Sequence, residues 1–497
     1  MTIGLLPRTA DRTRSHGRSM RADDKALISI SLITGLAGVL RMLYLTSQGI
    51  TLDESFSVYL GRAGSFEFFH TICTSEFNMA LYYMLLRGWM HLGNGEWIIR
   101  SLGVLLSTAT VPVIYAIGSR LFDRRTGIVS ALLIAVHPYH LILAQRARSY
   151  PLAILLVSLS SLPFIRLVQK PSVVSAMKYA ALSAAAVYSH FFSLFVIGAQ
   201  LCSVLVLPRS RVPWKLLAAS VSVLAALLVP FGWFTLTHAS TSHVGWVQEL
   251  SVQQTLLVLY ALTLSKARSL IYLALWCAAG YMWLQQSDTT RWPYAFLFAW
   301  LVLPISLTAV VSVRHPLMIE RYLSVCLPAS VLLAGAGLVS LLRFSRVLAV
   351  GILVIVLLHS FAAIRFYDRH PEFAEGWREG SRSILSRVQP GDVVIAESLT
   401  GYTFDYYRDT FVKPLPPFSR LDSMATTLVE PLPGNVWILA SIRFNPNWRG
   451  ATPGAAEAAV QKFAEAHKGE YCPAPPYFQA GEARVWQFRR CSKGTGR

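Results

Sequence analysis

Two adjacent carboxylates, Asp53 and Glu54, follow the first long apolar stretch of the chain. Acidic side chains are costly at the edge of a lipid phase unless they meet water, a partner or a functional role. At such a position a carboxylate could accept a proton from an attacking hydroxyl group or bind a cation. Taken alone, the pair is better explained as a solvated helix end, so a functional interpretation depends on the rest of the chain.

Further polar side chains recur where other apolar stretches end. Arginine is prominent among them, and its planar, permanently charged guanidinium is well suited to grip phosphate. Each residue also has an ordinary explanation, because arginines near helix ends reach toward lipid headgroups and tyrosines are common at membrane interfaces. If the helices bring these groups together, they form a cavity equipped for anionic chemistry. The candidates are Arg146, Arg148, Tyr150, Tyr188, His190, Arg314, His315, Glu320, Arg321 and Tyr322.

The elements that must position these side chains are membrane-spanning helices. Hydrophobic residues make up 54% of the chain and charged residues 14%, whereas a soluble protein carries about 25% charged residues. The apolar runs are continuous rather than alternating, which favours helices over a barrel. We therefore expect an α-helical polytopic membrane protein with about eleven spans. The expected spans are 26–47, 97–119, 127–144, 150–168, 176–189, 190–208, 214–235, 268–286, 292–312, 322–342 and 346–364.

The basic residues indicate how the helices are oriented. Six of them precede the first apolar run, and most others concentrate in alternate connections, so the N-terminus is expected in the cytoplasm. No small-residue cleavage site follows before Asp53, which favours an uncleaved signal anchor. Topology and phospholipid contact then explain the net charge of +19, and no nucleic-acid partner is expected. The expected domains are a basic N-terminus (1–25), a transmembrane domain (26–364) and a periplasmic or extracellular C-terminal domain (365–497).

Two of the outside regions are long enough to carry structure of their own. The first, 48–96, is aromatic and amphipathic and is expected to form one or two helices in the membrane interface. The run 252–264 is either a twelfth span or an interfacial helix, and its short length favours the interface. The second, 365–497, turns polar and is expected to form a small α/β domain. Its expected strands are 392–396, 436–440 and 484–488, with helices at 374–388 and 454–468. Cys472 and Cys491 flank strand-like segments and are a candidate disulfide if this domain is extracytoplasmic. The cysteine spacing does not indicate a zinc site.

Several segments, in this order along the chain, resemble the bacterial type C (GT-C) glycosyltransferases. This membrane group includes protein O-mannosyltransferases and the aminoarabinose and galacturonate transferases of lipid A, and more narrowly the chain is similar to the dolichyl-phosphate-mannose-protein mannosyltransferase-like set. The matching segments are Thr51-Leu52-Asp53-Glu54-Ser55, residues 78–89, residues 95–102, Gln145-Arg146-Ala147-Arg148-Ser149-Tyr150, Tyr188-Ser189-His190-Phe191, Glu320-Arg321-Tyr322-Leu323, Gly376-Trp377-Arg378 and residues 390–394.

The resemblance implies transfer of a sugar from a polyprenyl-phosphate donor to an envelope lipid, glycan or protein at the outer face of the cytoplasmic membrane. Asp53 would be the catalytic base of an inverting attack, and Glu54 would orient the acceptor or bind a cation. Arg148 and Arg321, with Arg146 and His190, would stabilise the phosphate leaving group, and Tyr82, Tyr150 and Tyr322 would contact substrate.

Two departures from the family pattern bear on this expectation. Arg146 stands where the family usually has a glutamate, which removes a candidate second carboxylate, and Ala80 stands where it favours proline. The residues identify no cofactor with certainty, and a divalent metal at Asp53 and Glu54 stays open.

Two other functional classes compete with the glycosyltransferase. A transporter or lipid flippase would place its charged site near the bilayer midplane and often shows internal repeats, whereas these charges gather at outer helix ends. A structural or interaction protein would need no such cluster. Substitution of Asp53 distinguishes these functional classes, because only an enzyme should lose turnover.

Overall fold

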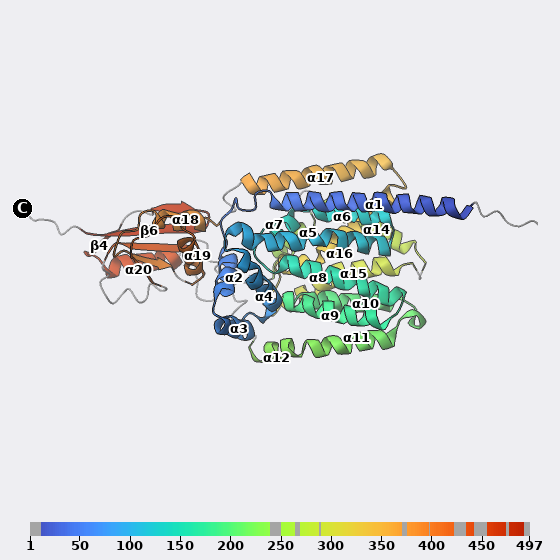
Figure 1. Cartoon of the computed structure of the whole chain (residues 1–497), viewed down its shortest axis with the longest axis horizontal. Coiled ribbons are helices and arrows are strands. Elements are labelled where there is room, and N and C mark those ends of the chain that lie inside the picture. The colour runs from blue at the N-terminus through green and yellow to red at the C-terminus, as the bar shows by residue number, and fades with distance from the viewer. Residues whose placement is uncertain are drawn as a thin grey trace, which may run out of the picture.

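The computed structural model describes residues 11–238, 250–263, 269–287, 290–369, 375–396, 398–421, 434–441, 455–473 and 477–491. They form a bundle of apolar helices with a small α/β domain at one end, and a layer of short helices lies between the two parts (Figure 1). The predicted fold class, a polytopic helical protein with a C-terminal α/β domain, is therefore confirmed.

The helices of the bundle differ in how deeply they are buried. In the segment that includes α16, the most apolar stretch of 18 residues is entirely buried, whereas 22% of the corresponding stretches of α1 and α17 is buried, and these two helices lie at the periphery. The bundle helices are α1 (Asp11–Met42), α5 (Glu96–Leu121), α6 (Arg124–Val136), α7 (Pro138–Ala144), α8 (Tyr150–Gln169), α9 (Val173–Ser189), α10 (Ser193–Ser203), α11 (Trp214–Leu227), α12 (Val229–Thr237), α13 (Val252–Leu262), α14 (Ser269–Leu284), α15 (Trp292–Ser312), α16 (Leu327–Leu341) and α17 (Arg346–Arg369).

The number of membrane spans stays a prediction. Within the described residues, 6 helices are long and apolar enough to cross a membrane, or up to 8 if each bent pair counts as one span. The bent pairs are α6 with α7 and α11 with α12, and three further apolar helices are shorter than a usual span. The orientation of the termini likewise stays a prediction.

The bend of 58° between α6 and α7 is stabilised by a buried arginine. Pro138 begins α7 and supplies no backbone N–H, so the break leaves carbonyl groups without helical partners. Arg41, from α1, donates hydrogen bonds to the carbonyls of Ile134 and Ala135 and to the ring of His140. Because a cation within an apolar bundle needs such acceptors, the pairing fixes α7 against α1. The loop that follows α7 carries two of the candidate arginines, Arg146 and Arg148.

Three α-helices fill the connection between α1 and α5, so the prediction of one or two was wrong. They are α2 (Leu52–Arg62), α3 (Ser65–Thr74) and α4 (Ala80–Trp89). The chain turns at Gly64 between the first two, and a short 3-10 turn at Phe77–Met79 separates the last two. These turns cut a continuous amphipathic stretch into separate helices, which cover the end of the bundle that faces the α/β domain (Figure 1).

The C-terminal domain is a mixed sheet with helices packed against it. Strand order is β2-β1-β3-β6-β4, and β5 also pairs with β6. The first three strands in this order are parallel, and β6 runs antiparallel to its neighbours. The elements are α18 (Trp377–Leu385), β1 (Val393–Ala396), α19 (Ser398–Asp409), β2 (Ser419–Leu421), β3 (Val436–Ser441), α20 (Ala455–Ala466), β4 (Tyr471–Pro473), β5 (Phe478–Ala480) and β6 (Ala483–Arg490). Each predicted strand and helix of this domain is present within a few residues of its expected place. A disulfide joins Cys472 in β4 to Cys491 just after β6.

Candidate active site

Asp53 lies in the first turn of α2, at the end of the bundle. The helix begins with a capping box, in which Thr51 and Glu54 satisfy each other's backbone N–H groups. This local pairing fixes where α2 starts and therefore where Asp53 is held. The Asp53 side chain is 34% exposed, and its Oδ2 accepts a hydrogen bond of 3.0 Å from Nη1 of Arg321. Asp53 is thus a carboxylate that substrate can reach.

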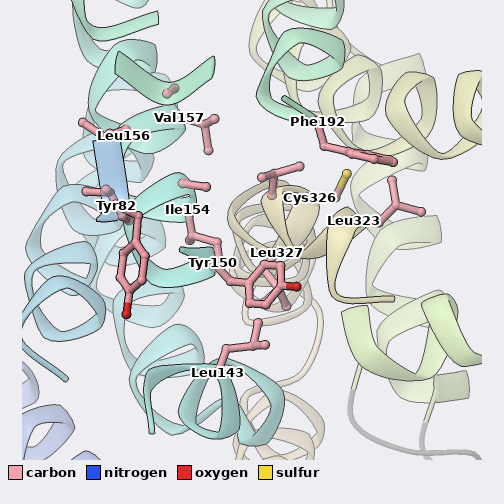
Figure 2. Packing of buried hydrophobic residues seen from close by; sticks show 14 of the residues in the cluster. Tyr82, Leu143, Tyr150, Ile154, Leu156, Val157, Phe192, Leu323, Cys326 and Leu327 are labelled. Atoms are coloured by element: carbon pink, nitrogen blue, oxygen red, sulfur yellow. The ribbon is translucent and has the colours of Figure 1, made fainter. Parts of the chain in front are cut away.

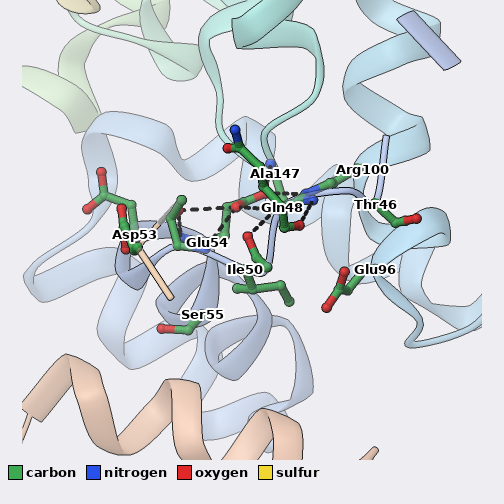
Figure 3. Close-up of polar contacts among 12 residues, drawn as sticks. Thr46, Gln48, Ile50, Asp53, Glu54, Ser55, Glu96, Arg100 and Ala147 are labelled. Atoms are coloured by element: carbon green, nitrogen blue, oxygen red, sulfur yellow. Dashed lines mark hydrogen bonds and ion pairs between the residues drawn. The ribbon is translucent and has the colours of Figure 1, made fainter. Parts of the chain in front are cut away.

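Glu54 is the structural member of the predicted pair. Its carboxylate is fully buried and accepts hydrogen bonds from Arg100 Nε at 2.9 Å and Arg100 Nη2 at 2.8 Å. The backbone N–H groups of Ala147, at 2.8 Å, and Thr51, at 3.0 Å, also donate to it. Figure 3 shows Glu54 pointing toward Arg100 and Ala147, away from the Asp53 carboxylate. A pocket on this side is lined by Glu54, Arg100 and Arg146, among others.

The loop between α7 and α8 is held close to α5 by a glycine. A Cβ added at Gly103 would lie 2.6 Å from the carbonyl oxygen of Ala144 and 3.2 Å from that of Arg146. Only a residue without a side chain therefore allows this approach. The approach brings the Ala147 N–H to Glu54 and the Arg148 side chain to α2. Asp53 and Glu54 therefore both accept hydrogen bonds from this one loop.

Arg148 and Arg321 converge on Asp53 from two different loops. Arg148 Nη1 donates to the Asp53 carbonyl oxygen at 3.2 Å and to Ser57 Oγ at 3.3 Å. Burial alone would raise the pKa of Asp53, but the positive charges of Arg148, Arg321 and Arg146 outweigh it and hold the pKa below its ordinary value. Asp53 is therefore ionised at neutral pH. These arginines are also suited to bind a phosphate at this place.

Several buried polar atoms around the arginines have no hydrogen-bond partner among the described residues. They are the hydroxyls of Tyr82 and Tyr150, Nε2 of His190 and Nε of Arg148. Figure 2 shows Tyr82 and Tyr150 within a wall of apolar side chains, and the His190 ring lies 5.6 Å from the ring of Tyr150 and 5.2 Å from that of Tyr322. An orphaned buried donor is costly unless something else satisfies it. These atoms are suited to bind a polar ligand in the complex.

The predicted site residues thus fall into two groups. Asp53, Arg148, Arg321 and the ring cluster of Tyr150, His190 and Tyr322 lie together, whereas Glu54 is committed to internal contacts. Arg146 contributes its charge to both Asp53 and Glu375. The partner of Glu54, Arg100, was not among the predicted site residues. The sequence could have identified Arg100, because an arginine one turn inside an apolar helix requires a buried acceptor.

The candidate metal ligands do not fit a metal ion. Both Glu54 oxygens already accept N–H donors, and Asp53 faces three arginines that would repel a divalent cation. No group of three or more histidine, cysteine, aspartate and glutamate side chains is placed to share an ion in the part of the chain that the structure describes. The positive charge at Asp53 is supplied by arginine.

Both sequence and structure are similar to known glycosyltransferases. Residues 79–234 match the dolichyl-phosphate-mannose-protein mannosyltransferase family. The structure of ArnT from Cupriavidus metallidurans superimposes with a TM-score of 0.61 at 13% identity, over 92% of this chain and 97% of that one. The chain has a GT-C fold. The predicted resemblance to the type C glycosyltransferases is confirmed for the fold, and the match to the mannosyltransferase family covers residues 79–234.

Two ligand-bound structures with the GT-C fold are also similar. ArnT bound to undecaprenyl phosphate gives a TM-score of 0.61 at 14% identity, covering 92% of this chain and 97% of that chain. The archaeal oligosaccharyltransferase AglB from Archaeoglobus fulgidus, in complex with an inhibitory peptide and a dolichol-phosphate, gives 0.51 at 11% identity, covering 95% and 75%. No curated protein sequence matches the chain significantly. The family match contains Tyr82, Arg148 and His190, whereas Asp53 and Arg321 lie outside it.

Proposed function

We propose that the protein transfers a sugar from a polyprenyl phosphate to an envelope acceptor at the outer face of the bacterial cytoplasmic membrane, with Asp53 as the catalytic base. The observation that carries the proposal is the accessible Asp53 carboxylate at the end of a GT-C bundle, which pairs with Arg321 and lies close enough to Arg148 for that charge to lower its pKa. The bound polyprenyl phosphates of ArnT and AglB support the class of donor.

The proposed reaction is a single displacement at the anomeric carbon. The acceptor oxygen forms a bond to that carbon, the bond from carbon to the phosphate oxygen breaks, and the electron pair leaves with polyprenyl phosphate. The acceptor proton passes to Asp53, which is ionised and able to receive it. Glu54 is not available as a nucleophile because donors occupy its oxygens, and this supports inversion rather than the two-step retaining route.

The arginines have two successive roles in this proposal. In the free protein Arg321 pairs with Asp53 at 3.0 Å. The donor phosphate competes for Arg321 and Arg148, since a phosphate offers several strong acceptor oxygens. As these cations turn to the phosphate, the basicity of Asp53 rises where the acceptor proton arrives. The same arginines stabilise the charge that develops on the leaving phosphate, and no strong general acid is needed.

The orphaned atoms of Tyr82, Tyr150 and His190 complete the binding site. They lie among apolar side chains near Arg148 and Arg321, where the headgroup of a lipid-linked sugar would meet the end of its hydrocarbon tail. Tyrosine hydroxyls and a histidine nitrogen suit the hydroxyls of a sugar or the oxygens of a phosphate. We assign these three residues to donor binding rather than to proton transfer.

The test is release of free polyprenyl phosphate from liposomes that contain the purified protein, a panel of polyprenyl-phosphate sugars and mixed envelope acceptors. Wild type is compared with Asp53→Asn and with Asp409→Asn, which removes an equal charge from the more exposed end of α19. We expect release by wild type and Asp409→Asn, and a loss of about a hundredfold or more in Asp53→Asn. Equal release by all three would remove Asp53 from catalysis. Absence of release across the panel by folded wild type would favour the transporter or binding alternatives.

A further inference from the structure

The seven residues before α2 are held by side chains of the C-terminal domain. We call residues 45–51 the lead-in segment, because it connects α1 to the helix that carries Asp53. Arg378, in α18, donates from Nη2 to the carbonyl oxygens of Thr46 and Gln48, each at 2.9 Å, and from Nη1 to that of Ser47 at 3.3 Å. A single side chain of the C-terminal domain thus satisfies three successive carbonyl groups of the lead-in segment.

A second side chain of the C-terminal domain holds the middle of the lead-in segment. The hydroxyl of Tyr407, in α19, accepts a hydrogen bond of 2.7 Å from the N–H of Ile50 and donates one of 3.0 Å to Glu96 at the start of α5. Glu96 also forms an ion pair with Arg378. Because Glu96 belongs to the bundle, the three side chains join α5, the lead-in segment and the C-terminal domain in one network.

A third contact reaches the first residue of α2 itself. Oε2 of Glu375 accepts hydrogen bonds from the N–H of Leu52 at 2.8 Å and from Nε1 of Trp377 at 2.7 Å. The backbone carbonyl of Glu375 accepts from the N–H groups of Glu482 and Ala483, at 3.0 Å each. The N-terminus of α2, one residue before Asp53, is therefore tied through Glu375 to the hairpin that begins β6.

The fit between the lead-in segment and the C-terminal domain leaves no room for a side chain at its centre. A Cβ added at Gly49 would lie 2.9 Å from Cβ of Arg378 and 3.0 Å from the Tyr407 hydroxyl. From the opposite side, Arg100 donates to the carbonyl oxygens of Leu45, Gln48 and Gly49, as Figure 3 shows in part. The lead-in segment is thus held between the bundle and the C-terminal domain.

We propose that the C-terminal domain positions the catalytic helix, with Tyr407, Arg378 and Glu375 as positioning residues that fix α2 and thereby Asp53. This inference rests on the proposed function of Asp53. None of the three touches the reacting atoms. Their effect should fall on the rate of the chemical step, since a displacement of about 1 Å at a catalytic group costs up to a hundredfold in rate. Affinity for the lipid-linked donor, which the arginines and the ring cluster provide, should change much less.

The matched variants are Tyr407→Phe and Tyr406→Phe in the full-length protein. Both remove one hydroxyl from adjacent residues of α19 at the domain junction, but the Tyr406 hydroxyl donates to the carbonyl of Asn94 at 3.1 Å and does not touch the lead-in segment. The readouts are hydrogen exchange of the amides of residues 46–56, and kcat and KM for release of polyprenyl phosphate. Glu375→Ala and Glu375→Gln form a second pair, because the glutamine oxygen can still accept from Leu52 and Trp377.

We expect Tyr407→Phe and Glu375→Ala to accelerate exchange in residues 46–56 and to lower kcat roughly tenfold to a hundredfold with KM nearly unchanged. Tyr406→Phe and Glu375→Gln should behave as wild type. Unchanged exchange in Tyr407→Phe and Glu375→Ala would overturn the inference, and so would faster exchange with unchanged kcat. Wild type that exchanges slowly but releases no polyprenyl phosphate would count against the proposed function instead, while exchange would still decide whether the domain holds α2.

Discussion

The adjacent residues Asp53 and Glu54 should respond in opposite ways to loss of charge. The sharper case is Glu54→Gln. Each Glu54 oxygen accepts at least two N–H donors, from Arg100, Ala147 and Thr51. Whichever way the glutamine amide turns, its NH₂ group must face donors. The substitution also leaves the Arg100 charge, whose side chain is 4% exposed, without its partner.

The expected loss can be worked from these contacts. Removing one partner from a buried ion pair costs about 3–5 kcal/mol, because the remaining charge stays buried and uncompensated. Asp53→Asn, by contrast, removes a single ion pair from a carboxylate that is one-third exposed, which is worth at most about 1 kcal/mol. Glu54→Gln should therefore lower the thermal unfolding midpoint clearly, whereas Asp53→Asn should leave it close to wild type.

The assay is thermal unfolding of the detergent-solubilised protein, followed by tryptophan fluorescence. A double variant, Glu54→Gln with Arg100→Met, removes both charges and should recover part of the loss, because replacing a buried pair by apolar groups is often neutral. The dependence of stability on acidic pH provides a second test. Arg100 and the backbone donors hold the pKa of Glu54 at about 2 against the effect of burial, so its contribution is present above pH 4.5 and lost as the pH falls toward 2. A Glu54→Gln protein that unfolds at the wild-type temperature would refute this reasoning.

Three further predictions follow from other contacts. Gly103→Ala should cost about 1–3 kcal/mol and most of the turnover, because the new Cβ meets backbone oxygens of the loop that carries Arg148, whereas Gly88→Ala, which meets nothing within 4 Å, should do neither. Treatment with EDTA should leave release of polyprenyl phosphate unchanged, and a loss restored by added divalent cation would contradict the assignment of positive charge to arginine. Burial raises the pKa of Glu375 to about 7 despite the Leu52 N–H and the charge of Arg146, with Glu482 acting in the same direction as burial. The stabilising contribution of protonated Glu375 is thus present below pH 4.5 and lost as the pH rises through 7, and Glu375→Gln should flatten that part of the stability profile.

The sequence predicted the elements that depend on local pattern. The apolar runs and the change to a polar composition after residue 365 correctly indicated a helical bundle and a C-terminal α/β domain. The convergence of Asp53, Arg148 and Arg321 also followed from their places at helix ends. The internal turns of the 48–96 region were missed, because an amphipathic pattern continues across Gly64 and Phe77–Met79 while the helices end there.

The different roles of Asp53, which is exposed, and Glu54, which is buried, could not be predicted from their adjacent positions in the sequence. Successive residues of a helix point in directions about 100° apart, so neighbours in sequence can face different surroundings. The buried partner of Glu54 lies 46 residues away, and the contact of Tyr407 with Ile50 spans 357 residues. Periodicity and motif spacing carry no information about such distant pairs. The role of the C-terminal domain therefore required the structure.

The central claim is that Asp53 performs chemistry in transfer from a lipid-linked sugar. The most direct measurement is turnover of Asp53→Asn in liposomes, on protein whose unfolding midpoint is measured in the same preparation. We predict a wild-type midpoint together with a loss of polyprenyl phosphate release of about a hundredfold or more. Wild-type release from a folded Asp53→Asn protein would contradict the account.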